Sequence, residues 1–161
     1  PKFRADNCRT EHSEVTKRRF KKPVTTISSR DGVYDSKLKK LNEKGSLPHN
    51  VVIAAAESNP SVLHPAPFSV ELAEWFVKIG SDVGDTVLDP FAGSSTTGVA
   101  SLKNERNFIG IDLVEFNINF GRKRMEHLLS TGECYIPKNK LEEYDIDVNY
   151  YKIKGKHINN P

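Results

Sequence analysis

The sequence predicts an α/β fold in which a mostly parallel β-sheet is flanked by helices. Residues 86–88 form a short apolar strand that ends at a carboxylate, and a turn of small residues then leads into a helix beginning near Thr96. Residues 107–112 repeat the pattern of an apolar strand with a carboxylate at its end. A strand–helix–strand unit with short links places the two strands parallel, joined by a right-handed crossover. Because few buried strands are visible, we expect the sheet to be incomplete in this chain.

Composition bounds the class of protein. The 161 residues are enough for one domain with its own core, and 37% of them are hydrophobic. No apolar run approaches the ~20 residues that span a bilayer, and no signal-peptide pattern opens the chain. Cys8 and Cys134 match no metal-ligand spacing. We therefore expect two free thiols, no metal site and a reducing, cytoplasmic compartment.

Charge is distributed unevenly along the chain. Residues 1–44 hold 13 Lys or Arg against 6 Asp or Glu, whereas residues 45–161 hold 11 against 15. We expect a basic N-terminal arm over residues 1–45, an α/β core over 46–130, and a C-terminal strand or hairpin with a tail over 131–161. A basic arm favours a polyanionic partner, with nucleic acid first, and a solvated lysine-rich flank is the alternative.

Local patterns predict the elements before the core. Residues 24–27 favour a short strand, and residues 36–44 favour a polar helix that ends at Gly45. Residues 51–53 are apolar and are expected to form a buried strand.

Two amphipathic helices are expected beside the predicted strands. Residues 69–80 begin at a suitable N-cap, Ser69, and end at Gly80. Residues 115–129 form the second helix, whose basic run at 122–124 is expected on a solvated face. The apolar positions expected to be buried are Leu72, Trp75, Phe76 and Ile79 in the first helix, and Phe116, Ile118, Phe120, Met125 and Leu129 in the second.

Two carboxylates mark the sheet edge at which open α/β folds bind ligands. Asp89 and Asp112 each end a strand, and Asp112 lies 19 residues after Gly93. That spacing is close to the one at which the acidic residue of a dinucleotide fold meets the ribose hydroxyls. The turn between them exposes backbone N–H groups at the positive end of a helix dipole. The pattern favours a ligand that contains adenosine.

Three familiar site types fail at specific residues of this turn. A phosphate-binding P-loop needs a lysine after its second glycine, but Val99 follows Gly98. A dinucleotide turn needs glycine at position 95, which is serine. A hydrolase nucleophile elbow needs its second glycine one residue before Gly98. S-adenosylmethionine fits what remains, because its carboxylate suits the N–H groups of the turn, its ammonium suits Asp89 and its ribose suits Asp112.

Three segments carry a family resemblance. Residues 89–98, D-P-F-A-G-S-S-T-T-G, resemble the D-P-F-x-G-S-G-T-T motif of the amino-directed DNA methyltransferases. Residues 64–68, H-P-A-P-F, resemble the cofactor motif that these enzymes place just upstream. Residues 107–116, N-F-I-G-I-D-L-V-E-F, resemble their next strand, with the ribose-binding acid at Asp112. This order is that of the permuted (beta) class, and the resemblance covers about residues 46–129.

The resemblance implies a partial Rossmann-like fold that binds S-adenosylmethionine and serves methyl transfer to an exocyclic amine of double-stranded DNA, as in restriction-modification systems. With this resemblance, residues 1–45 are either a basic N-terminal arm or the end of a target-recognition region. The residues expected to bind the cofactor are His64, Pro65, Ala66, Phe68, Asp89, Phe91, Ala92, Gly93, Ser94, Ser95, Thr96, Thr97, Asp112 and Leu113.

Two departures from the family pattern shape this expectation. Ser95 replaces the usual glycine; we expect it to keep a negative φ, and its presence favours cytosine N4 over adenine N6 as the target. No two prolines are adjacent in the chain, so the family's Pro-Pro-aromatic catalytic motif is missing and no catalytic residue is assigned. We therefore expect the cofactor-binding part of a DNA methyltransferase, completed by a second polypeptide or by a missing N-terminal half.

Two other functions stay open on the sequence. One is a non-catalytic subunit that binds cofactor or DNA within a larger methyltransferase or restriction-modification assembly. The other is a methyltransferase of RNA or small molecules with the same fold class, which the permuted motif order disfavours.

Overall fold

Two units make up the chain, and each is described by itself. The computed structural model describes residues 3–21, 24–27, 34–37, 41–49, 51–55, 57 and 67–147. The larger unit comprises Pro1–Arg4 together with Val51–Pro161, and the smaller comprises Ala5–Asn50.

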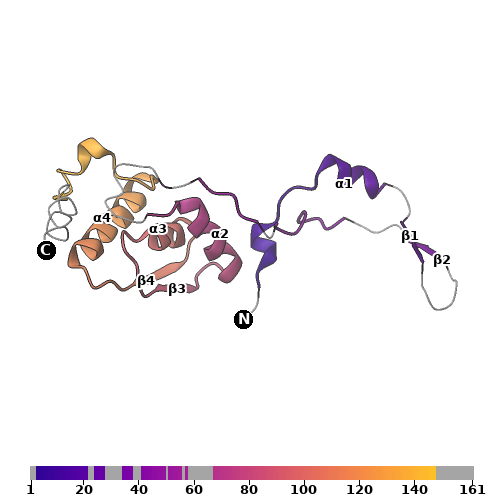
Figure 1. Cartoon of the computed structure of the whole chain (residues 1–161), viewed down its shortest axis with the longest axis horizontal. Helices are drawn as coiled ribbons and strands as arrows, with labels where there is room; N and C mark the ends of the chain where they lie inside the picture. The colour runs from indigo at the N-terminus through magenta and orange to yellow at the C-terminus, as the bar shows by residue number, and fades with distance from the viewer. Residues whose placement is uncertain are drawn as a thin grey trace, which may run out of the picture. The chain divides into compact units, whose positions relative to one another are not determined.

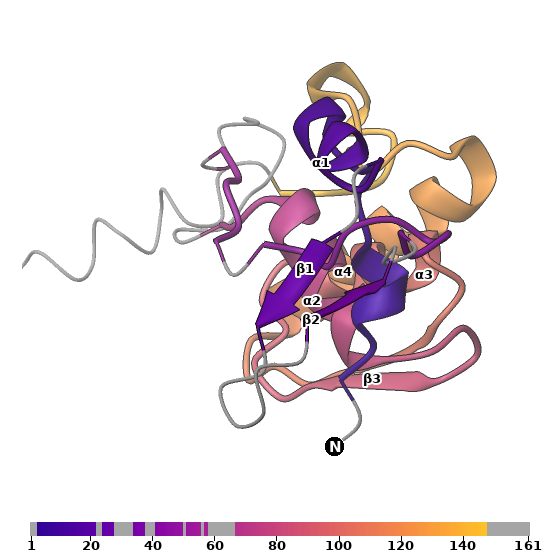
Figure 2. The same cartoon turned by 90° about the vertical axis from the view of Figure 1, so that its right-hand side faces the viewer.

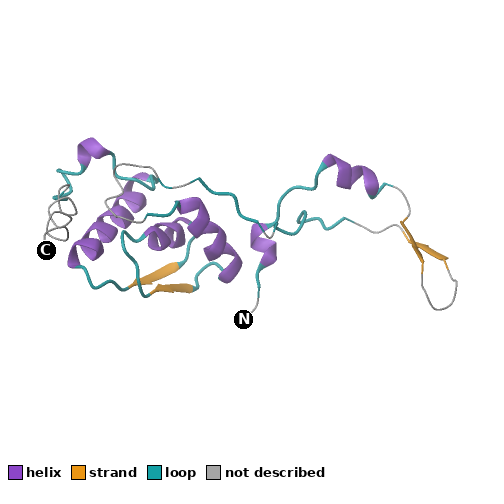
Figure 3. Cartoon of the chain, in the orientation of Figure 1, coloured by secondary structure: helices purple, strands orange, loops and turns teal. Residues whose placement is uncertain are grey.

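The strand–helix–strand segment of the larger unit is as predicted. β3 (Thr86–Asp89) and β4 (Asn107–Gly110) pair in parallel, with Val87 opposite Phe108. α3 (Thr96–Lys103) connects the two strands (Figure 3). The α/β class with a parallel sheet is therefore confirmed, and over the described residues that sheet has two strands.

Three helices lie on one side of this strand pair. They are α2 (Val70–Gly80), α3 and α4 (Glu115–Thr131), and α3 contacts both strands and both other helices (Figure 1). Ser69 caps α2 as predicted, because its Oγ accepts a hydrogen bond from the Leu72 N–H at 3.3 Å. The stack of helices on α3 positions the turn between β3 and α3, which carries the predicted site.

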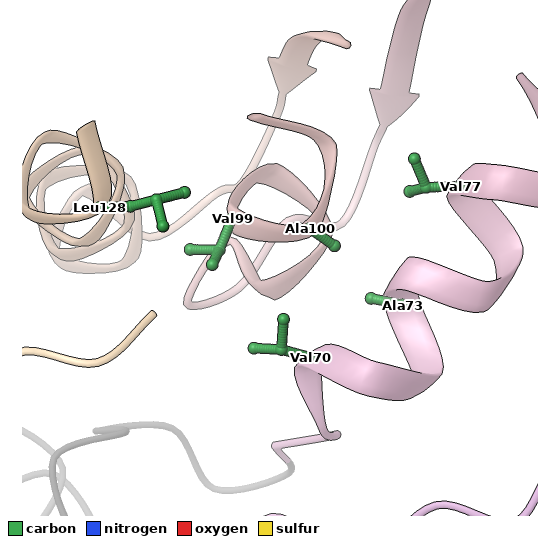
Figure 4. Packing of buried hydrophobic residues seen from close by; sticks show 6 residues of the cluster. All are labelled: Val70, Ala73, Val77, Val99, Ala100 and Leu128. Carbon is green, nitrogen blue, oxygen red and sulfur yellow. The ribbon is translucent and has the colours of Figure 1, made fainter. Parts of the chain in front are cut away.

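The main core lies between the three helices (Figure 4). Its buried residues are Val70, Ala73 and Val77 of α2, Val99 and Ala100 of α3, and Leu128 of α4. The buried face predicted for α2 is wrong at Phe76, which is 59% exposed, while Leu72 and Trp75 are half-buried and Ile79 is buried. The reason is close packing: α3 presents small side chains, so the small residues of α2 lie nearest to it.

A second cluster packs the segment that follows α4. Its buried residues are Phe120, Ile136, Leu141 and Ile146. Phe120 was predicted to be buried, whereas Leu129, predicted to be buried as well, is exposed. Where a C-terminal strand or hairpin was expected, residues 132–147 hold turns and the 3-10 helix η2 (Lys138–Lys140). Residues 148–161 lie outside the described residues.

The smaller unit contains one predicted element and one wrong prediction. Its elements are η1 (Ala5–Cys8), α1 (Glu14–Arg19), β1 (Val24–Ile27) and β2 (Tyr34–Lys37). β1 is the strand expected at this position, and it pairs antiparallel with β2 (Figure 2). The helix expected at residues 36–44 is wrong, because β2 includes residues 36–37 and residues 41–44 hold a turn. Strand pairing with β1 overrides the helical preference of this polar segment.

Three further expectations can be compared with the structure. Residues 51–53 form no strand, and Val51 and Ile53 are exposed, so the buried strand expected there is wrong. Cys8 and Cys134 are free thiols, as expected. In the part of the chain that the structure describes, no helix combines the length and apolar character needed to cross a bilayer.

Candidate functional site

The turn between β3 and α3 is built onto the carboxyl ends of both strands. The Ile111 N–H donates to the Asp89 carbonyl at 2.9 Å, and the Ala92 N–H donates to the Ile111 carbonyl at 2.8 Å. A bond from the Ser95 N–H to the Ala92 carbonyl, at 2.7 Å, closes the turn just before α3. The glycine turn therefore lies at the sheet edge where parallel α/β folds bind ligands.

Both predicted carboxylates hold this turn. Asp89 Oδ1 accepts a hydrogen bond from the Phe91 N–H at 3.0 Å. Asp112 Oδ2 accepts from the Gly93 N–H at 2.9 Å, and its Oδ1 accepts from the Val114 N–H at 2.8 Å, at the start of α4. Asp112 thus joins the turn after the first strand to the helix after the second. The structure brings the two acids, distant in sequence, onto the same turn.

The first N–H groups of α3 follow directly after the turn. The first hydrogen bond within that helix runs from the Val99 N–H to the Ser95 carbonyl at 2.9 Å. The preceding N–H groups, of Thr96, Thr97 and Gly98, therefore have no acceptor inside the helix. Ser95 stands at the N-cap but makes no side-chain capping bond. Such groups lie at the positive end of the helix dipole and can bind a carboxylate.

Ser95 differs from its predicted conformation. Its φ is +57°, in the left-handed region, so the expected negative φ is wrong. The turn requires a left-handed residue directly before α3, the conformation that glycine adopts most easily. Gly121 of α4 leaves room for the serine, because a Cβ added at Gly121 would lie 2.6 Å from the Ser95 Cβ. A glycine on the facing helix thus accommodates the side chain that replaces a glycine in the turn.

Arg124 is a buried residue of the site, although its neighbours in the sequence led us to expect it in solvent. It belongs to the basic run expected on a solvated face of α4, yet it is 1% exposed. Its Nη1 donates to the Ser94 carbonyl at 2.6 Å and to Thr96 Oγ1 at 3.2 Å. Burial lowers the pKa of its guanidinium. The helical spacing of the buried positions Asn117, Phe120, Gly121, Arg124 and Leu128 is the signal in the sequence that places it inside.

Two apolar side chains that follow the paired strands are exposed. Phe91 is 86% exposed, and Leu113 is fully exposed. Each of them follows the carboxyl end of one of the paired strands. An exposed aromatic ring and an exposed leucine beside polar N–H groups offer a surface on which a purine can pack.

An apolar groove runs between α2 and β3. Its volume is about 490 Å³. Its lining includes Phe68, Leu72, Phe76, Thr86, Val87 and Thr97. Two predicted site residues, Phe68 and Thr97, therefore share one groove. Leu72 and Phe76, two large apolar residues of α2 outside the core cluster, face this groove.

The comparison with protein families decides the family. The sequence model described as DNA methylase, of the N6/N4 methyltransferase type, matches residues 2–121. The chain belongs to this DNA methylase family. The resemblance to amino-directed DNA methyltransferases, which the three sequence motifs predict, is thereby confirmed.

Curated relatives of this DNA methylase are longer than the chain. The type II methyltransferase M.BglI of Bacillus subtilis is 42% identical over 99 residues, which make up 59% of this chain and 27% of the relative. The DNA adenine methyltransferase YhdJ of Escherichia coli (strain K12) is 40% identical over 63 residues, or 39% of this chain and 21% of the relative. The chain thus spans about a quarter of the length of M.BglI.

Solved structures resemble this DNA methylase over part of the chain. The M1.HpyAVI–SAM complex matches at 30% identity and a TM-score of 0.45, covering 57% of this chain and 47% of that chain. The PvuII DNA methyltransferase, described as cytosine-N4-specific, matches at 25% identity and a TM-score of 0.45, covering 61% of this chain and 36% of that chain. Both TM-scores lie below 0.5, so the family assignment rests on the sequence match.

The predicted cofactor residues of this DNA methylase fall into separate groups in the structure. The turn holds Asp89, Phe91, Ala92, Gly93, Ser94, Ser95 and Thr96, and Asp112 is bonded to it. Phe68 and Thr97 line the groove, and Leu113 is exposed after β4. His64, Pro65 and Ala66 lie outside the described residues.

Proposed function

We propose that this DNA methylase binds S-adenosylmethionine at the turn between β3 and α3 and serves the methylation of an exocyclic amine in double-stranded DNA. The observation that carries the proposal is the 2.9 Å bond from the Gly93 N–H to Asp112, which places the carboxylate of the second strand on the glycine turn. A nucleoside with an ammonium and a carboxylate meets complementary groups there.

Each group of the turn has a separate task in this proposal. When bound, S-adenosylmethionine would supply the methyl group of its sulfonium to the amine of the base, which would leave S-adenosylhomocysteine and release the amine's proton to water. The N–H groups at the start of α3 bind the carboxylate of the cofactor, and Asp89 lies beside the position for its ammonium. Asp112 accepts from the ribose, while Phe91 and Leu113 pack against the adenine. Phe68 and the residues His64, Pro65 and Ala66 also contribute to cofactor binding in this proposal, as the family motif implies.

Cofactor binding is tested by titration calorimetry on the full chain. S-adenosylmethionine is expected to bind, and Phe91→Ala is expected to weaken binding about tenfold. Because the Phe91 ring is exposed, the melting temperature should not change. Leu129→Ala, which removes an exposed leucine from α4, is the matched control and should bind as the wild type does. Absence of binding to the wild type would remove the cofactor role.

We favour cytosine N4 over adenine N6 as the methylated atom. The proposal rests on Ser95, which stands where the family motif has glycine. DNA methylated with labelled cofactor, by the chain together with its completing partner, is digested to nucleosides for mass spectrometry. N4-methylcytosine is the expected product, and N6-methyladenine would contradict the preference.

A completing partner, either a second polypeptide or a further N-terminal half, supplies the catalytic Pro-Pro-aromatic motif in this proposal. The motif is missing from the sequence, and large apolar residues of α2, Leu72 and Phe76, line a groove along β3 instead of the core. Further strands or helices of the fold can pack against an apolar groove beside a sheet edge.

Methylation assays test this completion directly. The chain alone is expected to transfer no methyl group to DNA, and adding a polypeptide that carries the motif should produce transfer. Transfer by the chain alone would contradict the idea. Cofactor binding with no transfer in the presence of the partner would favour the non-catalytic subunit, an alternative that the missing motif supports.

Exposed basic side chains of the smaller unit provide the DNA contact in this proposal. Lys17, Arg18, Arg19 and Lys21 are all exposed on or just after α1. Replacing Arg18 and Arg19 with alanine should weaken duplex binding and reduce the slope of log K against log salt by about 2. Lys140→Ala, an exposed basic residue of the larger unit, is the control and should leave the slope nearly unchanged.

A further inference from the structure

Arg124 is a buried cation directly behind the proposed cofactor turn. Its Nη1 donates to the Ser94 carbonyl at 2.6 Å, to Ser94 Oγ at 3.2 Å and to Thr96 Oγ1 at 3.2 Å. All of these acceptors are neutral. Arg124 therefore holds the last part of the turn and the first residue of α3. None of these acceptors carries a negative charge that would neutralise the guanidinium.

No carboxylate pairs with this guanidinium among the described residues. Its Nε and Nη2 are buried and have no hydrogen-bond partner there. The guanidinium carbon lies 5.9 Å from the centre of the Phe120 ring and 5.7 Å from that of Tyr135. The Tyr135 hydroxyl donates to Glu57, so the acid of this neighbourhood engages the phenol.

A buried charge of this kind has an energetic cost. Removing an arginine from water carries a large desolvation penalty, and neutral dipoles and aromatic faces offset only part of that penalty. An anion bound at the start of α3 would offset more of it. The N–H groups of Thr96 and Thr97 have no acceptor inside the helix, and they are the donors that such an anion would meet.

We propose that Arg124 is a positioning and specificity residue for the carboxylate end of the ligand. It orients the N–H groups at the start of α3 by holding the Ser94 carbonyl and the Thr96 hydroxyl, and its charge strengthens the positive potential there. This inference rests on the proposed cofactor role of the turn. It adds a selection rule: Arg124 tightens binding of nucleosides that carry a carboxylate and leaves the binding of the nucleoside portion unchanged.

Two ligands separate this role from a merely structural one. S-adenosylhomocysteine carries the carboxylate, whereas 5′-methylthioadenosine shares its adenosine and thioether but lacks the amino-acid end. In titrations of the full chain, Arg124→Met should weaken binding of S-adenosylhomocysteine at least tenfold, because it removes the charge and keeps most of the apolar stem. The affinity for 5′-methylthioadenosine should change less than about threefold.

Control variants on the same side chain and the same helix complete the experiment. Arg122→Met removes a charge from the exposed face of α4 and should change neither affinity. Arg124→Lys keeps the charge and should retain the preference for the carboxylate-bearing ligand. If Arg124→Met does not fold, the measurements on Arg124→Lys still test the proposal.

The outcomes distinguish this inference from the proposed function. Equal losses for both ligands in Arg124→Met, or loss of the preference in Arg124→Lys, would show a structural role and overturn the inference. A wild type that binds both ligands equally would also overturn it while leaving the cofactor site in place. A wild type that binds neither ligand would overturn the proposed function and this inference with it.

Discussion

The two faces of the β3–β4 pair carry similarly apolar side chains but differ in what covers them. Val87 and Phe108 alternate with Leu88 and Ile109 along the strands, and the first pair is half-buried whereas the second is 60% and 54% exposed. Strands that are apolar on both faces are typical of parallel sheets with helices on both sides. The exposed face therefore has the composition of a covered one, which supports a completing partner for this chain.

On the covered face of the strand pair, α3 lies very close to the strands. α3 meets the sheet through Gly98, where an added Cβ would lie 2.6 Å from Phe108 Cε1. At Gly110 an added Cβ would lie 2.7 Å from the same ring atom. Phe108 is thus enclosed by two glycines, and its ring has little room to move. Ile109 on the other face is 54% exposed, so truncating the two neighbours should have different costs.

The largest expected effect is that of Phe108→Ala. It should lower the free energy of unfolding by about 2–3 kcal/mol, because a packed ring is lost and a cavity remains. Ile109→Ala, its neighbour on the exposed face, should cost less than about 1 kcal/mol. Urea unfolding of the larger unit can be followed by the fluorescence of Trp75, the single tryptophan. Equal costs at the two positions would mean that the second face is covered in solution.

The next effect comes from the contact between the turn and α4. Gly121→Ala should destabilise the fold by about 2 kcal/mol, because the new methyl group collides with the Ser95 side chain. Ser95→Gly removes that collision and the left-handed strain, so the double variant should recover at least about 1 kcal/mol of the loss. A double-mutant cycle by urea unfolding measures the coupling. Additive effects would contradict the close packing of these two residues.

The smallest effect concerns an ion-pair network on the covered side. Glu74 of α2 pairs with Lys78 at 3.2 Å and with Lys103 of α3 at 2.5 Å. Burial alone raises the pKa of the Glu74 carboxyl, but the hydrogen bonds from Lys103 and Lys78 outweigh it and hold the pKa below the ordinary 4.5. A carboxyl with a lowered pKa stabilises the fold above the unfolded-state value, and that stabilisation is lost as pH falls through the folded-state pKa.

A pH series tests this linkage. At neutral pH, Glu74→Gln should cost about 0.5–1 kcal/mol, since both lysines are partly solvated. The difference from wild type should shrink as the pH falls below 4.5, the ordinary pKa of a glutamate carboxyl. Glu71→Gln, an exposed acid of the same helix, serves as the control. A difference that stays constant with pH would show that the charge of Glu74 has no part in stability.

Much of the site could be predicted from sequence because its signals are local. The apolar runs of β3 and β4, the small residues of the turn and the Ser69 cap each involve neighbours within a few residues. The meeting of Asp89 and Asp112 at one turn followed from chain connectivity, since parallel strands bring their carboxyl ends to the same edge. These features could be predicted without knowing how the helices pack against one another.

The wrong predictions share a dependence on distant partners. Phe76 looks like a core residue of α2, but the small side chains of α3 draw Ala73 and Val77 inward instead. Ser95 adopts a left-handed φ that glycine would favour, because Gly121 leaves space for its side chain. In each case the outcome was set by a helix far away in sequence, whose approach no local pattern describes.

Amino-acid order alone was enough to establish the α/β class, the glycine turn between its strands and the family, because strand and turn propensities act over short distances. Packing was needed to bury Arg124 and to bond Asp112 to the Gly93 N–H. The physical reason is that burial and hydrogen-bond partners are properties of the assembled helices. A charged residue within a basic run is predicted to be solvated, and only the packing of a second element against it shows that it is buried.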